Sequence, residues 1–303
     1  MNKIVIKGKF EVINSKFLKF LEKYKKNNEY KVIFLFNDSK LISFESRKLL
    51  LEQHLQDLNY EIVKWDGRKF NNNCIIQLGK QNESGNYVSK RSGKNINVDI
   101  RLYINQLIDA PLNYLKYYLE NRYFIFDKIA NMMSEERYKH TISVALTAVE
   151  IAKANGINPK KPFLAAMLHD IAKDTSVDVT KNLMLKCFKK HLNEEKVVYH
   201  QFVGTIFARK LFKIYNKDIL NAIKYHTTGN KNMSVCAKIV YSADKIEPTR
   251  GYDSKYMIDA CKNDVNEGFR LVLHENIVFL KSKNVKIGGL TQEAIDFYQI
   301  NNL

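Results

Sequence analysis

The stretch Ala165-Ala166-Met167-Leu168-His169-Asp170-Ile171-Ala172-Lys173 places an imidazole and a carboxylate side by side within an apolar segment. Its spacing predicts a helix over Leu164–Lys173, and Pro162 suits the first turn of that helix. Buried polar groups need hydrogen-bonding partners, and buried charges need an opposite charge or a metal ion. The simpler alternative is a polar pair on the helix surface. Whether the pair is buried at a site or exposed has to be judged from the polar residues elsewhere in the chain.

The composition is that of a folded protein long enough for two domains. The chain has 303 residues, of which 45% are hydrophobic, 12% aromatic and 27% charged, and this balance excludes a disordered chain. No apolar run approaches the roughly 20 residues of a membrane helix, and the first residues lack the layout of a signal peptide. We therefore expect a cytoplasmic protein with no membrane segment.

Cysteine spacing and charge leave the choice of partner open. The cysteines have neither zinc-knuckle nor redox spacing, so we expect reduced thiols at Cys74, Cys187, Cys236 and Cys261. The net charge of +17 is compatible with a nucleic-acid, anionic-membrane or polyphosphate partner. The lysines are spread along the chain, however, and the composition of an AT-rich genome explains them as well. A nucleic-acid partner stays open, and the oligomeric state is unknown from the sequence.

Residues 1–124 alternate predicted strands with predicted helices. Strands are expected at residues 3–6, 30–36, 61–65 and 74–78. Helices are expected at residues 15–26, 46–58, 99–108 and 111–122, with a polar loop at 81–94. This alternation predicts a parallel α/β domain of Rossmann-like type.

From residue 125 onward the strand pattern vanishes. Helices are predicted at residues 134–154, 164–173, 179–191, 194–212, 218–226, 234–245 and 255–281. Gly156 follows the first of these and suits the position just beyond a helix C-terminus. Residues 125–303 are therefore expected to form an all-α helical bundle.

Four histidines and two aspartates adjoin apolar helix faces in this second domain: His140, His169, Asp170, His200, His226 and Asp244. A single histidine on such a face is more often a core residue, but six such residues on five predicted helices indicate a metal site. Imidazole and carboxylate together suit iron, manganese or zinc. Six ligands exceed the needs of one tetrahedral ion, so we expect two ions, which can clamp a phosphate and activate a water. The remaining histidines lack such neighbours: His54, His191 and His274.

The order His, His-Asp, Asp resembles the HD-domain phosphohydrolase superfamily, and longer motifs resemble its YqeK-type hydrolases. These motifs are RYKHT at 137–141, MLHDIAK at 167–173, YHTTGN at 225–230 and KIVYSADKIEPTR at 238–250. Members of that family are bacterial symmetrical dinucleoside-tetraphosphate hydrolases with a di-iron centre. The resemblance covers about residues 126–300 and implies that the six residues ligate two ions, iron first, with manganese and zinc as alternatives.

The same resemblance implies diadenosine tetraphosphate as the substrate, split at its centre into two ADP. Asp170 is the expected catalytic residue and bridging ligand, because the Asp of the HD pair tends to bridge the ions in this superfamily. Lys173 is expected to assist catalysis and contact phosphate, and Arg250 could clamp phosphate through its planar guanidinium. Further substrate contacts are expected just after His226, at Thr227, Thr228 and Gly229. For Lys173 and for the residues after His226, an ordinary helix end is the alternative. Glu247, in the same Pro-containing turn as Arg250, either supports a ligand or is purely structural.

The N-terminal domain resembles a degenerate nicotinate-nucleotide adenylyltransferase. That family carries a Gly-Gly-Ser-Phe-Asp-Pro-x-His-x-Gly-His loop, whose two histidines hold the triphosphate. In the matching register, residues 7–17, the histidine positions are occupied by Asn14 and Phe17. The family's later phosphate motif would align with residues 97–101, where only Ile100 and Arg101 match. We expect a catalytically inactive nucleotidyltransferase-like domain, with a generic Rossmann-like sheet as the alternative.

Three functions stay open at the level of the sequence. The first is metal-dependent symmetrical hydrolysis of dinucleoside tetraphosphates by residues 125–303. The second is hydrolysis of another nucleotide by an HD domain. The third is a nucleotide- or RNA-binding regulatory protein with a basic N-terminal domain, and the intact set of six ligand residues argues against it.

Overall fold

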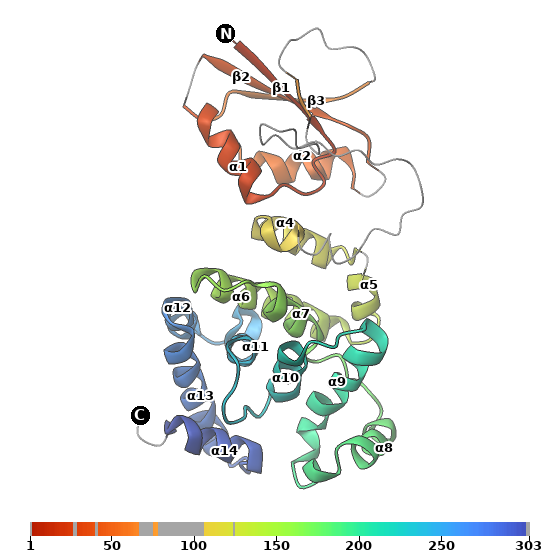
Figure 1. Ribbon diagram of the computed structural model, residues 1–303, viewed down its shortest axis with the longest axis vertical. Helices are drawn as coiled ribbons and strands as arrows, with labels where there is room; N and C mark the ends of the chain where they lie inside the picture. Colours follow the sequence, from red (N-terminus) through yellow and green to blue (C-terminus); the bar gives the residue numbers. More distant parts are fainter. Residues whose placement is uncertain are drawn as a thin grey trace. The chain divides into compact units, whose positions relative to one another are not determined.

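The computed structural model describes residues 2–26, 29–39, 42–66, 75–77, 106–123 and 125–300. The chain divides into two compact units, Met1–Tyr117 and Tyr118–Leu303 (Figure 1). The predicted boundary between residues 124 and 125 lies a few residues beyond this division. Within the described ranges, no helix has both the length and the apolar character needed to cross a membrane.

The first unit is built on a parallel sheet. Its strands are β1 (Asn2–Gly8), β2 (Tyr30–Phe36), β3 (Tyr60–Lys64) and β4 (Ile75–Gln77), in the order β3-β2-β1-β4. All three strand pairs are parallel, as predicted, and the same order of four strands occurs within a Rossmann sheet. The helices between the strands are α1 (Ser15–Leu21), the 3-10 turn η1 (Glu22–Tyr24) and α2 (Phe44–Glu52).

Period-two alternation of apolar residues explains how this sheet packs. Ile4, Ile6 and Phe34 belong to one hydrophobic cluster with residues of α1 and α2, whereas Val5 and Ile33 belong to a second cluster. The chain continues through α4 (Leu112–Glu120). Several predictions fall outside the described residues: Cys74, the loop at 81–94, the motif at 97–101 and the first part of the helix at 99–108.

The second unit is helical, as predicted. Its longer helices are α5 (Ile125–Ala130), α6 (Glu135–Ala154), α7 (Lys160–Leu168), α8 (Val177–Cys187), α9 (Tyr199–Phe212), α10 (Lys217–Tyr225), α11 (Val235–Ile246), α12 (Lys255–Asn263), α13 (Val265–Ser282) and α14 (Gly289–Tyr298). Three 3-10 turns accompany them, η2 (Lys189–His191), η3 (Lys196–Val198) and η4 (Pro248–Arg250). Helix α7 packs against α6, α10 and α11, and α11 also packs against α6 and α10.

The prediction of a single helix over residues 255–281 is wrong, because the helix is interrupted at Asp264, between α12 and α13. Asp264 is extended, with φ of −149°, and its carboxylate accepts hydrogen bonds from the backbone N–H groups of Asn266 and Glu267. It therefore caps a new helix. The two helices then pack closely at Gly268, where an added Cβ would lie 2.4 Å from the Cα of Cys261.

The helix that carries the His169-Asp170 pair also ends earlier than predicted. Helix α7 stops at Leu168, and the next residues form successive turns. The backbone N–H of His169 bonds to the carbonyl of Ala166, and that of Lys173 to the carbonyl of Asp170, both three residues back. His169 keeps helical backbone angles, with φ of −59° and ψ of −44°, but the pair lies at the end of α7 rather than in its middle.

Candidate metal centre

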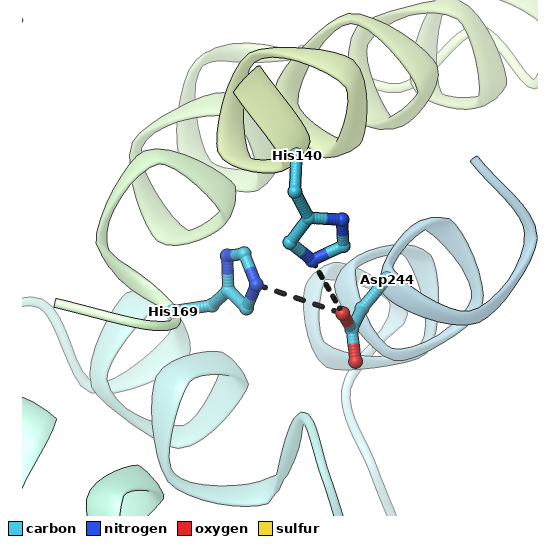
Figure 2. Close-up of side chains that lie close together, drawn as sticks. All are labelled: His140, His169 and Asp244. Carbon is cyan, nitrogen blue, oxygen red and sulfur yellow. Dashed lines mark hydrogen bonds and ion pairs between the residues drawn. The ribbon is translucent and has the colours of Figure 1, made fainter. Parts of the chain in front are cut away.

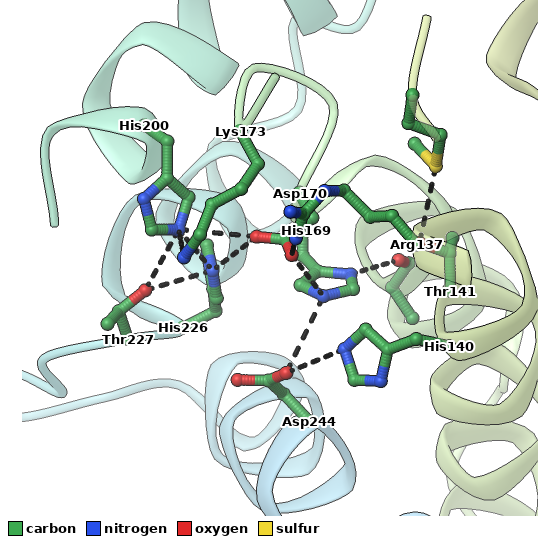
Figure 3. A network of polar contacts seen from close by, with 12 residues as sticks. Arg137, His140, Thr141, His169, Asp170, Lys173, His200, His226, Thr227 and Asp244 are labelled. Carbon is green, nitrogen blue, oxygen red and sulfur yellow. Dashed lines mark hydrogen bonds and ion pairs between the residues drawn. The ribbon is translucent and has the colours of Figure 1, made fainter. Parts of the chain in front are cut away.

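The six predicted ligand residues come together at one place in the helical unit. His140 lies on α6, His200 near the start of α9 and Asp244 on α11. The others lie just beyond helix ends: His169 and Asp170 after α7, and His226 after α10. Five of the six are buried, and His140 is half-buried. Their assignment as metal ligands stays a prediction, but their convergence is a structural fact (Figure 3).

One half of this cluster is formed by His140, His169 and Asp244 (Figure 2). The Oδ1 atom of Asp244 lies 3.1 Å from Nε2 of His140 and 3.6 Å from Nε2 of His169. Two imidazole nitrogens thus face one carboxylate oxygen. We define these three residues as the first cluster.

The second cluster consists of Asp170, His200 and His226. The Oδ1 atom of Asp170 lies 3.2 Å from Nε2 of His200 and 3.4 Å from Nε2 of His226. Its Oδ2 atom lies 3.9 Å from Nε2 of His169 and accepts a 2.9 Å hydrogen bond from Arg137. The two oxygens of Asp170 therefore face the two clusters (Figure 3).

Each imidazole is held so that its Nε2 atom faces inward. In three of them Nδ1 donates to the carbonyl three residues earlier, at 2.6 Å for His169 and 2.8 Å for His200 and His226. In His140, Nδ1 lies 2.9 Å from a carboxylate oxygen of buried Glu247. With Nδ1 engaged in this way, the Nε2 atom of each ring is the nitrogen left to bind a cation. This is the tautomer and support that metal-binding histidines have.

The inward-facing nitrogens fit a metal ion better than they fit each other. Nε2 of His169 is buried and makes no hydrogen bond within the described residues. Nε2 of His200 and Nε2 of His226 lie only 3.1 Å apart. Burial lowers the pKa of His200 and lowers that of His226 to about 3, so both rings are neutral near pH 7. The facing Nε2 atoms of His200 and His226, and the unbonded Nε2 of His169, are therefore suited to bind a cation.

The two aspartates supply the negative charge. Burial alone would raise the pKa of Asp170, but the neighbouring histidines bring it well below its ordinary value. For Asp244, burial is likewise outweighed by Lys245, His140 and His169, and its pKa also falls well below the usual range. Both carboxylates are therefore ionised at neutral pH and can bind a hard or borderline cation.

A cavity of about 510 Å³ opens beside the two clusters and is lined by four cationic side chains, Arg137, Lys173, Lys245 and Arg250. Three of them are tied to the clusters' aspartates. Arg137 donates to Asp170, Lys245 donates to Asp244 at 2.8 Å, and Arg250 donates to Asp244 at 2.7 Å. Cationic walls around paired carboxylates suit a ligand that carries several negative charges.

Lys173 and Thr227 lie at the second cluster. The ammonium of Lys173 is 3.2 Å from Nε2 of His200, and burial lowers its pKa. The hydroxyl of Thr227 is 2.9 Å from Nε2 of His226, and Thr227 lines the cavity. Both groups therefore donate toward the lone pairs at which a metal ion would bind (Figure 3).

Thr228 and Gly229 take part in the packing behind the cavity. The buried Thr228 hydroxyl bonds to Gln201 and to the carbonyl of Gly229. Gly229 has φ of +69°, and an added Cβ would contact Ala294 and Tyr241. Neither residue is among those that line the cavity. Their role as substrate contacts stays a prediction, and the geometry assigns them a structural role.

Two site residues, Arg137 and Lys245, were not singled out from the sequence. Arg137 stands three positions before His140, so it lies one turn away on the same face of α6. Lys245 directly follows Asp244, and Glu247 lies three residues beyond Asp244. Helical spacing from a predicted ligand was the available signal for Arg137. For Glu247 the sequence left a supporting and a purely structural role open, and the contact with His140 favours the first.

Comparison with known proteins places the helical unit in a family. The HD domain model matches residues 137–249. A relative in Halalkalibacterium halodurans, named bis(5'-nucleosyl)-tetraphosphatase, symmetrical, is 35% identical over 162 residues, which cover 51% of this chain and 84% of that protein. A Mycoplasma genitalium protein, named probable nicotinate-nucleotide adenylyltransferase/Ap4A hydrolase, is 30% identical over 54% of this chain and 49% of its own length.

A solved structure agrees with these sequence matches. A Clostridium acetobutylicum protein, described as a predicted HD superfamily hydrolase involved in NAD metabolism, has a TM-score of 0.53 and 30% identity, covering 58% of this chain and 97% of its own. The resemblance predicted from the sequence motifs is thereby confirmed. The chain is an enzyme and belongs to the family of HD-domain hydrolases that includes the symmetrical bis(5'-nucleosyl)-tetraphosphatases.

Proposed function

We propose that the chain hydrolyses diadenosine tetraphosphate and related dinucleoside polyphosphates symmetrically, giving two ADP, at a dinuclear metal centre. The observation that carries the proposal is the pair of clusters, in which four imidazole Nε2 atoms and two ionised carboxylates converge beside a cationic cavity. The names of the relatives support the substrate. Two sets of ligands bridged by one aspartate support two ions rather than one.

The proposed ligands follow from the two clusters. His140, His169 and Asp244 would hold one ion, and His200 and His226 the other, with Asp170 between them. When bound, the ions would lower the pKa of an attacking water and clamp the phosphate under attack. Histidine with carboxylate suits iron, manganese and zinc, and iron is our first choice because the motifs resemble a di-iron family.

The cationic side chains would bind and orient the phosphate chain. Arg250 and Lys245 sit against Asp244, where they can neutralise phosphate oxygens next to the first cluster. Lys173 does the same at the second cluster, and the Thr227 hydroxyl can donate to a phosphate oxygen there. Arg137 spans Asp170 and Asp174 and so fixes the bridging carboxylate. These residues would hold the central phosphates while water attacks one of them.

The N-terminal domain, which we place at residues 1–124, is proposed to be an inactive nucleotidyltransferase-like scaffold. The two positions where the related enzymes carry histidine have structural tasks here. The side chain of Asn14 accepts a 2.9 Å hydrogen bond from the backbone of Phe17 and so caps α1. Phe17 is buried in the hydrophobic core next to Phe10. Neither residue offers an imidazole to a triphosphate.

Product analysis tests the hydrolysis. The purified, metal-loaded full chain is incubated with diadenosine tetraphosphate, and the nucleotides are separated by chromatography. We expect ADP as the sole product, and we expect its formation to be lost in His169→Ala but kept in the control His274→Ala, whose histidine lies outside both clusters. AMP with ATP as products would refute symmetrical cleavage. Turnover of a nucleoside di- or triphosphate alone would instead support an HD-domain hydrolase of another nucleotide.

A further inference from the structure

We propose that a second cavity, adjoining the metal centre, binds one purine nucleoside of the substrate; this inference rests on the proposed function. The second cavity has a volume of about 550 Å³, within the range of small-molecule sites. It lies among residues of α11, α12 and α13. Lys245, Arg250 and Asn276 line both cavities and therefore form the wall between them.

The lining of the second cavity has the chemistry that nucleobases need. Its walls include three aromatic side chains that are about half exposed, Tyr252, Tyr256 and Phe279, with exposures of 49%, 50% and 57%. Its floor is apolar and buried, formed by Met257 and Val272. Aromatic faces open to solvent provide surfaces on which a base can stack. Three such rings around one hollow are costly to expose without a ligand.

The wall between the cavities is held in place before any ligand binds. The hydroxyl of Tyr252 donates to the backbone carbonyl of Lys245, and the amide of Asn276 donates to the hydroxyl of Tyr241 at 3.1 Å. The guanidinium of Arg250 donates to the backbone carbonyl of Asp244 at 2.8 Å. Little ordering is therefore left to be done on binding, which favours affinity.

The change of polarity across this wall matches the polarity of a nucleotide. On one side lie ionised carboxylates, imidazoles and ammonium groups, which suit phosphates and metal ions. On the other side lie aromatic and aliphatic groups, with the carboxylate of Glu275 also in the lining. Lys245 and Arg250 stand where the two meet, so a phosphate next to Asp244 has its nucleoside in the aromatic cavity. This continuity argues for the substrate's own base rather than a peptide or a second copy of the chain.

Binding of ADP and of pyrophosphate to the metal-loaded full chain separates the two cavities. Both ligands carry a diphosphate, but only ADP carries a nucleoside. In the double variant Tyr256→Ala/Phe279→Ala, titration calorimetry should show an ADP affinity reduced roughly 10- to 100-fold, the range expected for lost base stacking. The pyrophosphate affinity should stay within about twofold of that of the wild type.

Matched controls remove aromatic side chains of similar exposure outside the second cavity. Tyr215→Ala and Phe297→Ala, at 66% and 51% exposure, should leave both affinities unchanged. Tyr256→Phe should keep the ADP affinity, because the ring rather than the hydroxyl stacks.

Two results would overturn the proposal. The first is an unchanged ADP affinity in the double variant, and a changed oligomeric state alongside it would identify the surface as a contact between copies. The second is an equal loss of ADP and pyrophosphate binding, which would mean a general disturbance. Hydrolysis by the wild type is measured separately. A chain that shows the expected ADP effect but does not cleave diadenosine tetraphosphate would refute the proposed function and retain the nucleoside site.

Discussion

Glu247→Gln removes one negative charge next to a proposed ligand without changing the size of the side chain. The Glu247 carboxylate is 1% exposed and lies 2.9 Å from Nδ1 of His140. Thr249 donates to it through its backbone N–H at 2.6 Å and through its hydroxyl. Burial would raise the pKa of Glu247, but these donors, His140 first, lower it to about 2, so the group is a carboxylate at any working pH. The substitution therefore deprives His140 of a charged acceptor.

The expected size of the effect follows from how a carboxylate supports a metal-binding histidine. The negative charge makes Nε2, the ring nitrogen opposite Nδ1, a stronger electron-pair donor to a metal ion, and it holds the ring in its orientation. Losing such a partner costs about 10- to 100-fold in metal affinity, or roughly 1.4 to 2.7 kcal/mol at 25 °C. The amide oxygen of Gln still accepts one hydrogen bond, but its NH₂ group then faces the donors of Thr249.

The assay is competition for the bound metal by a chelator, followed at a fixed temperature and pH. Glu150→Gln is the matched control, because it makes the same substitution at a glutamate on α6 that pairs with Lys262 on the surface. We expect reduced affinity in Glu247→Gln and wild-type affinity in Glu150→Gln, with similar thermal unfolding of the metal-free proteins. Wild-type metal affinity in Glu247→Gln would refute the role assigned to His140 and its partner.

Two further predictions concern the stability of the fold. Helix propensity alone predicts that Gly268→Ala raises the free energy of unfolding by about 1 kcal/mol. The 2.4 Å approach of the added Cβ to Cys261 instead predicts a decrease of about 1–3 kcal/mol. Chemical denaturation gives the sign, and a stabilised variant would contradict the close packing of α12 against α13. Burial, and after it the charges of Lys224 and Lys190, lowers the pKa of His191 in the folded protein. The neutral ring therefore contributes to stability above the unfolded-state pKa of about 6.5, and this contribution is lost as the pH falls below it. His191→Phe keeps a ring stacked on Phe202 and should flatten the acid decline in the free energy of unfolding, whereas an equally steep decline would argue against this cause.

Polar residues in apolar surroundings were the features of the site most readily predicted from the sequence. His169 and Asp170 were recognisable because Leu168 and Ile171 beside them belong in a core, and the structure buries all four. The same contrast identified the other four proposed ligands. The parallel sheet could also be predicted, because continuous apolar runs such as Tyr30–Phe36 are typical of buried parallel strands.

Local hydrogen bonding decided what the sequence pattern could not. Periodicity continues smoothly through residues 255–281, but the side chain of Asp264 captures two backbone N–H groups and starts a new helix. Periodicity likewise ran through Leu168 to Lys173, where bonds three residues back end the helix. The support of His140 by Glu247 joins α6 to the residue after α11, and contacts between residues 107 positions apart leave no trace in a local pattern.

The number of metal ions bound per chain tests the dinuclear centre most directly. Metal analysis of the full-length protein, purified without chelators, should give two ions per chain in the wild type. The double variant His200→Ala/His226→Ala, which removes both imidazoles of the second cluster, should retain one ion. A single ion in both proteins would contradict the dinuclear centre and leave a mononuclear site at His140, His169 and Asp244.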